Sequence, residues 1–166
     1  HEDHVRILKL LEMQYHAMLM YTSCGWFFDE VTGIESMQDI FYAKRAVQLA
    51  EEITGNNYED EFIKLLEKIP SNLPEYNNVL TAYEKYVKPM ALDMIRIGAH
   101  YAVSSLFEEF PEEVSLYNFT ATVKKRNYYE AGKRKILIGR TLFRSDITWE
   151  TVDITYAVLH MGDHHL

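Results

Sequence analysis

One apolar helix pattern that runs directly into an aromatic turn constrains this chain more than any other feature. From Val5 to Tyr21 apolar residues occupy nearly every face of the predicted helix, and a helix that is apolar all round is usually a central one, buried by its neighbours. The turn that follows contains three consecutive aromatic residues, Trp26, Phe27 and Phe28. Three large rings side by side cannot all face one core, so we expect at least one of them to face a cleft.

A long amphipathic helix is predicted directly after this turn. The segment Thr32-Gly33-Ile34-Glu35 is typical of a capping box, in which the Thr hydroxyl and the Glu side chain bond to backbone N–H groups of the first helical turn. Gly55 would end the helix in a left-handed conformation. Asp39 and Lys44 fall largely off the apolar stripe of this helix.

Helical periodicity continues to about residue 110. We expect a helix that begins at Asn57 and ends by Pro70, one over 75–87, and one over 90–107 that Pro89 kinks or divides from its predecessor. The last helix carries a strip of small residues that would let another helix come close: Gly98, Ala102 and Ser105.

After Pro111 the spacing of apolar residues changes from the helical repeat to the two-residue repeat of a strand. Apolar and polar residues alternate around 117–124, 135–144 and 152–158, with short turns between them. The predicted fold is therefore α+β and mainly α: a bundle of about five helices over residues 1–110, followed by a three-stranded antiparallel meander over 111–166 that packs on the bundle. We expect one truncated domain, because so few strands cannot form a stable core alone.

Charge and composition exclude several classes of function. The net charge is −8, and residues 1–110 carry 18 acidic and 9 basic side chains, which argues against a nucleic-acid partner. No leader and no run of about 18 apolar residues is present, so we expect no membrane span. The single Cys, Cys24, excludes an internal disulfide and fits a reducing, cytoplasmic location. Two basic triplets, 124–126 and 133–135, flank one predicted turn, and surface charge is the simpler interpretation of them.

Two blocks of sequence carry a family resemblance. The stretch Leu19–Glu30, with Glu12–Ala17 before it and Gly33–Ala46 after it, resembles the opening of the helical region in glycoside hydrolase family 57-like proteins. More narrowly, it resembles domain of unknown function 3536, which follows the catalytic barrel in one branch of them. Ala157–His164 is similar to a later block of the same domain. The chain begins at His1 without Met, so we expect a fragment whose catalytic barrel lies elsewhere in the parent protein.

The resemblance implies that the aromatic turn lies near a sugar substrate, since the helical region of such enzymes closes over the active-site cleft. Trp26, Phe27, Asp29 and Glu30 are the predicted substrate-binding residues, with an α-glucan as the ligand and the N-terminal barrel of the parent chain as the partner. An indole ring offers a flat apolar face to a pyranose. Adjacent carboxylates point in different directions and cannot form the facing pair of a glycosidase, so we expect no catalytic residue. The alternative is that Trp26 and Phe27 are core anchors.

Other candidate sites have simpler interpretations. Glu12 and His16 share one helix face and could bind a metal, but a local hydrogen-bonded pair is the simpler explanation. Cys24 is more typical of a small packed side chain than of a nucleophile. The segment containing His160, Asp163 and His164 has the composition of a transition-metal site, although the resemblance assigns it no such role. We therefore expect no metal and no cofactor.

Three functions remain open at this point. The preferred one is an accessory, non-catalytic region of a family 57-like protein that helps to shape the glycan cleft. The second is a helical metal-binding or oxidation enzyme that uses Glu12 and His16. The third is an interaction module that binds another protein through an open strand edge or its acidic helices.

Overall fold

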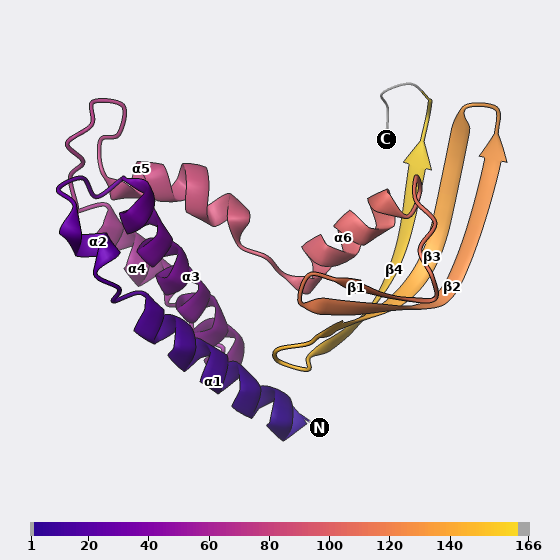
Figure 1. Ribbon diagram of the computed structural model, residues 1–166, viewed down its shortest axis with the longest axis horizontal. Helices are drawn as coiled ribbons and strands as arrows, with labels where there is room; N and C mark the ends of the chain where they lie inside the picture. Colours follow the sequence, from indigo (N-terminus) through magenta and orange to yellow (C-terminus); the bar gives the residue numbers. More distant parts are fainter. Residues whose placement is uncertain (1, 163–166) are drawn as a thin grey trace. The chain divides into compact units, whose positions relative to one another are not determined.

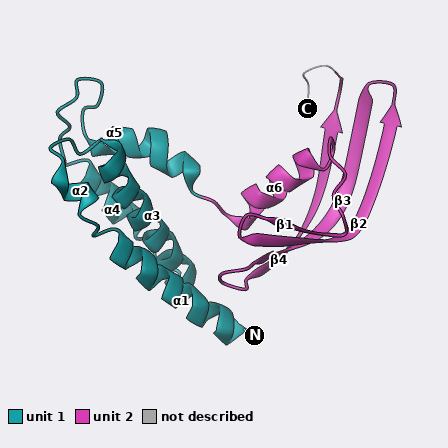
Figure 2. Cartoon of the chain, in the orientation of Figure 1, with its two compact units in different colours: residues 1–91 teal, residues 92–166 magenta. Residues whose placement is uncertain are grey.

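The computed structural model describes residues 2–162, and the chain divides into two compact units, His1–Ala91 and Leu92–Leu166 (Figure 1, Figure 2). The first unit is helical, and the second combines one helix with an antiparallel sheet. The predicted α+β class is therefore confirmed. Within residues 2–162, no helix combines the length and the apolar character needed to cross a bilayer.

Helix α3 organises the first unit, because α1, α2, α4 and η1 all contact it. The core of the first unit is formed by residues of α3, α4, α5 and η1, among them Met37, Leu66, Val79 and Tyr83. The elements are α1 (Glu2–Leu19), α2 (Cys24–Phe27), α3 (Ile34–Thr54), α4 (Glu59–Leu66), α5 (Val79–Ala82), the π-helical turn η1 (Tyr83–Val87) and the 3-10 turn η2 (Lys88–Met90).

The prediction that the first helix is central is wrong. No residue of α1 is buried, and its neighbour within the unit is α3. Polar side chains take part in that contact: Lys9 Nζ lies 2.9 Å from Glu52 Oε2, and the His16 ring lies 5.9 Å from that of Tyr42. The outer face of α1 consequently exposes a row of large apolar side chains: Ile7, Leu10, Leu11, Tyr15 and Met18.

The two ends of α3 differ in how well local sequence predicts them. Gly55 ends the helix with φ 73° and donates its N–H to Glu51 O at 2.8 Å, as predicted. The predicted capping box is wrong, because Gly33 is the N-cap residue and the Thr32 hydroxyl donates to Glu30 instead.

Two charged residues of α3 are buried, although they fall largely off its apolar stripe: Asp39 and Lys44. Lys44 Nζ lies 2.8 Å from Glu59 Oε2, and the Tyr83 hydroxyl donates to Glu59 Oε1 at 2.6 Å. Because a buried charge is costly unless it is paired, this three-residue contact explains how Lys44 is accommodated.

The predicted helix over 75–87 begins later, at Val79, where the side chain of Asn78 caps it. Pro89 lies in η2, and the next helix starts only at Met94, so the predicted division near this proline is confirmed.

Within residues 92–162 the second unit has four strands, so the predicted three-stranded meander is wrong in strand number. Helix α6 (Met94–Ser104) precedes β1 (Glu113–Leu116), β2 (Phe119–Ala131), β3 (Arg134–Ser145) and β4 (Thr151–His160), which pair antiparallel in chain order. The additional strand, β1, is short and ends before Tyr117, whose φ of 55° begins the turn into β2. Edge strands are therefore β1 and β4.

The small-residue strip of α6 contacts the sheet, so the prediction of a neighbouring helix is wrong. A Cβ added to Gly98 would lie 2.6 Å from Ile154 Cδ1 and 3.5 Å from the Phe143 ring. Helix α6 therefore belongs to the same compact unit as the strands, and Ile97 and Tyr101 share a core with the sheet residue Phe143.

A test of this sheet packing is Gly139→Ala. Gly139 pairs with Tyr156 across β3 and β4, and a Cβ there would lie 2.4 Å from both Cζ and the hydroxyl of that tyrosine. Displacing the ring should destabilise the chain by about 1–3 kcal/mol in urea denaturation. In a Tyr156→Ala background the same change should be neutral or stabilising, because alanine loses less backbone entropy than glycine. An equal loss of unfolding free energy in both backgrounds would contradict the packing of Gly139 against the Tyr156 ring.

Candidate functional site

The aromatic turn, residues 21–30, holds its rings at the surface of the first unit. Trp26 is 73% exposed, Phe27 is 75% exposed and Phe28 is 51% exposed. The interpretation of Trp26 and Phe27 as core anchors is therefore wrong. The rings of Phe27 and Phe28 lie edge to face with centroids 5.2 Å apart, so they form a small apolar surface that is accessible to a partner or a ligand.

Polar contacts to the first turns of α3 hold the aromatic turn in place. Ser36 Oγ donates to Gly25 O at 3.2 Å, and Thr22 Oγ1 donates to Asp39 Oδ1 at 2.5 Å. A Cβ at Gly25 would lie 2.1 Å from Asp39 Oδ2, so only glycine lets the backbone approach this carboxylate so closely. The turn is thus anchored through its backbone and Thr22, while the rings stay free.

Glu30 joins the end of the aromatic turn to a distant loop. Its carboxylate accepts hydrogen bonds from Thr32 N at 2.7 Å, Ser71 Oγ at 2.9 Å and Asn72 N at 2.9 Å, and from the Thr32 hydroxyl. These bonds, led by the one from the Thr32 hydroxyl, lower the pKa of Glu30 from 4.5 to about 2. Glu30 is therefore a structural cross-link with little capacity left for a ligand.

Asp29 differs from its neighbour. Its backbone carbonyl accepts from Asn72 Nδ2 at 2.8 Å, and the residue is exposed. No hydrogen bond to its carboxylate is found among the described residues. The two adjacent carboxylates thus have different roles: that of Glu30 holds the loop at 71–72, and that of Asp29 faces solvent.

An apolar groove of about 570 Å³ lies beside the Glu30 cross-link. Thr32 and Leu73 both line it, and Glu30 binds Thr32 and the two residues that precede Leu73. The other residues of the wall come from α3, from the loop before α5, and from η1 and η2: Ile34, Met37, Gln38, Phe41, Glu75, Tyr76, Tyr86, Val87 and Met90.

Two tyrosines of this groove are hydrogen-bonded to each other. The hydroxyls of Tyr76 and Tyr86 are 2.6 Å apart, and Lys85 Nζ lies 4.9 Å from the centroid of the Tyr86 ring. The hydrogen bond from Tyr76 lowers the pKa of Tyr86. Sequence reasoning missed both tyrosines, because the loop fold, and not any local pattern, brings them together.

The remaining candidate residues form no metal-binding cluster among the described residues. His16 Nε2 is 3.0 Å from Glu12 Oε1, and within the part of the chain that the structure describes no three His, Cys, Asp or Glu side chains gather as a metal site requires. The His160 ring packs edge-on against Phe107 at 5.4 Å, while Asp163 and His164 lie outside the described residues. Cys24 is exposed, so the expectation that it is packed is wrong.

The Glu30 cross-link predicts a pH-dependent stability. Glu30→Gln should lower the Tm at neutral pH, because a neutral amide cannot replace a carboxylate that accepts several donors. A depressed folded-state pKa contributes stability above the unfolded value of 4.5, and that contribution is lost as pH falls through about 2. The difference in Tm between wild type and variant should therefore shrink between pH 6 and pH 2, roughly over the interval between the two pKa values.

Asp29→Asn is the matched control, since it removes the adjacent charge without removing these hydrogen bonds. It should leave Tm nearly unchanged over the same pH range. A loss of Tm in Glu30→Gln that is constant with pH, or one that Asp29→Asn reproduces, would contradict the role of the Glu30 carboxylate as a cross-link.

Comparison with known proteins identifies the family of this chain. No curated protein matches it, and no solved structure matches it. The family described as a domain of unknown function (DUF3536) matches residues 1–166, which is the full length given. The chain therefore belongs to the DUF3536 family.

Proposed function

We propose that this chain is an accessory, non-catalytic region of a glycoside hydrolase family 57-like protein, and that it helps to shape the cleft for an α-glucan. The observation that carries the proposal is the exposure of Trp26 and Phe27 on a turn that is anchored independently of its rings. An indole that already faces solvent on an anchored backbone can stack on the C–H face of a pyranose without first leaving a core.

The state of the two carboxylates supports a binding role rather than a catalytic one. Glycosidases use two carboxyl groups that flank the scissile bond, roughly 5–10 Å apart. On this turn Glu30 is occupied by its hydrogen bonds to Thr32, Ser71 and Asn72. Asp29 alone is left to accept hydrogen bonds from sugar hydroxyls, and a single carboxylate cannot serve as both acid and base or nucleophile.

The outer face of α1 supports a neighbouring domain as the partner. Ile7, Leu11 and Met18 are each more than half exposed and lie along one side of the helix. Contiguous apolar surface of this kind marks an interaction site. In the proposal this face packs against the N-terminal catalytic barrel of the parent chain, which supplies the reactive carboxylates.

Titration calorimetry of the full 166-residue chain with maltoheptaose tests the binding role. Trp26→Ala should weaken binding by about tenfold, which corresponds to the roughly 1.4 kcal/mol expected for a lost stacking contact. Phe27→Ala should have an effect in the same direction. Tyr58→Ala removes an aromatic ring elsewhere in the first unit and should change the affinity by less than about twofold.

Two outcomes would contradict the proposal. If Trp26→Ala and Phe27→Ala leave the affinity unchanged, the aromatic turn does not contact the glycan. If the purified chain releases reducing sugar from starch above a heat-inactivated control, the region is itself catalytic.

A further inference from the structure

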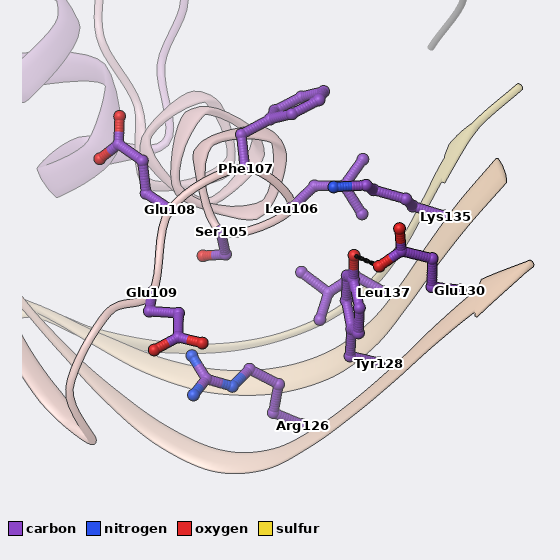
Figure 3. Close-up of a pocket in the computed structure, with 10 residues that line it drawn as sticks. All are labelled: Ser105, Leu106, Phe107, Glu108, Glu109, Arg126, Tyr128, Glu130, Lys135 and Leu137. Atoms are coloured by element: carbon purple, nitrogen blue, oxygen red, sulfur yellow. Dashed lines mark hydrogen bonds between the residues drawn. The ribbon is translucent and has the colours of Figure 1, made fainter. Parts of the chain in front are cut away.

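A second hollow, of about 380 Å³, lies in the sheet unit and shares no residue with the aromatic turn or the apolar groove (Figure 3). Strands β2 and β3 form its floor, and residues 105–109, which follow α6, form its wall. The volume lies within the range of small-molecule sites, roughly 300–1,000 Å³.

A β-bulge places polar residues on this face of β2. The ladder between β2 and β3 shifts register between Val123 and Lys125, and an extra residue in one strand reverses which side chains face each way beyond it. Even-numbered residues past the bulge therefore share the face of Val123. Figure 3 shows the side chains at these positions, Arg126, Tyr128 and Glu130, turned toward the hollow.

Acidic and basic groups alternate around the hollow. Glu130 pairs with Lys135 across β2 and β3, and both line the site. Arg126 lines it farther along β2, where its Nη1 donates to Phe110 O at 3.1 Å, and Glu109 supplies a carboxylate from the wall on that side (Figure 3). Two bases, Arg126 and Lys135, and three carboxylates line the hollow, the third being that of Glu108, so it does not favour a free anion and offers both hydrogen-bond donors and acceptors.

The apolar part of the hollow is an aromatic surface. Tyr128 is 44% exposed, and its hydroxyl donates to Glu130 Oε2 at 2.9 Å, which fixes the ring. Leu137, opposite Tyr128 in the ladder, is fully buried in the floor, while the Phe107 ring packs edge-on against His160. The lining therefore suits a ligand with an apolar face for the ring and hydrogen-bonding groups for the charged side chains.

We propose that this hollow binds a neutral polyhydroxylated ligand, namely a mono- or disaccharide, whose C–H face stacks on Tyr128. Glu109, Glu130 and Lys135 exchange hydrogen bonds with its hydroxyls. A pyranose combines these two surfaces, whereas phosphate would meet several carboxylates, and a small zwitterion such as glycine could pair with the charges but has no apolar face for the Tyr128 ring. The site is separate from the aromatic turn and stands whether or not that turn binds a glycan.

The test is titration of the full chain with glucose and maltose, followed by calorimetry or by amide chemical shifts. Tyr128→Ala should weaken binding of the better sugar by about tenfold or more. Tyr129→Ala is the matched control, because this adjacent tyrosine is 59% exposed on the opposite face of β2. It should change the affinity by less than about twofold.

A second pair of variants guards against misfolding of Tyr128→Ala. Lys135→Gln, which removes a donor charge in the hollow, should weaken binding by about threefold or more. Arg134→Gln, the neighbouring change on an exposed residue, should not.

The inference is overturned if neither sugar binds saturably, if inorganic phosphate or glycine binds in place of sugar, or if the variants and their controls lose affinity equally. A sugar response that Trp26→Ala abolishes and Tyr128→Ala leaves intact would also overturn it, while leaving the proposed function standing. A response that depends on Tyr128 alone supports the sheet site and counts against the aromatic turn.

Discussion

The aromatic turn depends on the close approach of its backbone to the carboxylate of Asp39. Gly25 is the residue that permits this approach, and Ser36 completes the anchor from the same helix. Anchoring through polar groups means that Trp26 and Phe27 are not needed to hold the turn, so their apolar area remains available. If the rings themselves stabilised the turn, they would be buried and could not contact a ligand.

Helix α1 likewise exposes apolar side chains, over a larger surface than the aromatic turn does. An apolar residue pattern on every side of a helix normally means burial on every side, and in this unit α3 covers one side only. The covered side includes polar contacts, among them the ion pair between Lys9 and Glu52. Much of the apolar content of the unit is therefore directed outward, which is the distribution expected of a region that completes its packing against another domain.

Sequence reasoning succeeded where the determinant is local. Gly55 ends α3 because its own φ requires glycine, and the change of period near residue 111 marks the sheet. The prediction failed where residues distant in sequence determine the local structure. Thr32 could cap α3, but its hydroxyl donates to Glu30, whose carboxylate is held by hydrogen bonds from the loop at 71–72. The bulge before Lys125 is likewise invisible in the residue pattern, although it determines which side chains line the sheet hollow. The exposure of Trp26 depends on which element packs beside it, and no local pattern contains that information.

The proposed function requires that the exposed, independently anchored aromatic turn contacts a glycan. Intermolecular nuclear Overhauser effects between maltoheptaose and the chain test it most directly, since they arise only between protons in contact. We expect contacts from the sugar C–H protons to the indole of Trp26 and the ring of Phe27, with shift changes concentrated in residues 21–30. Saturable binding with no contact to either ring would contradict it.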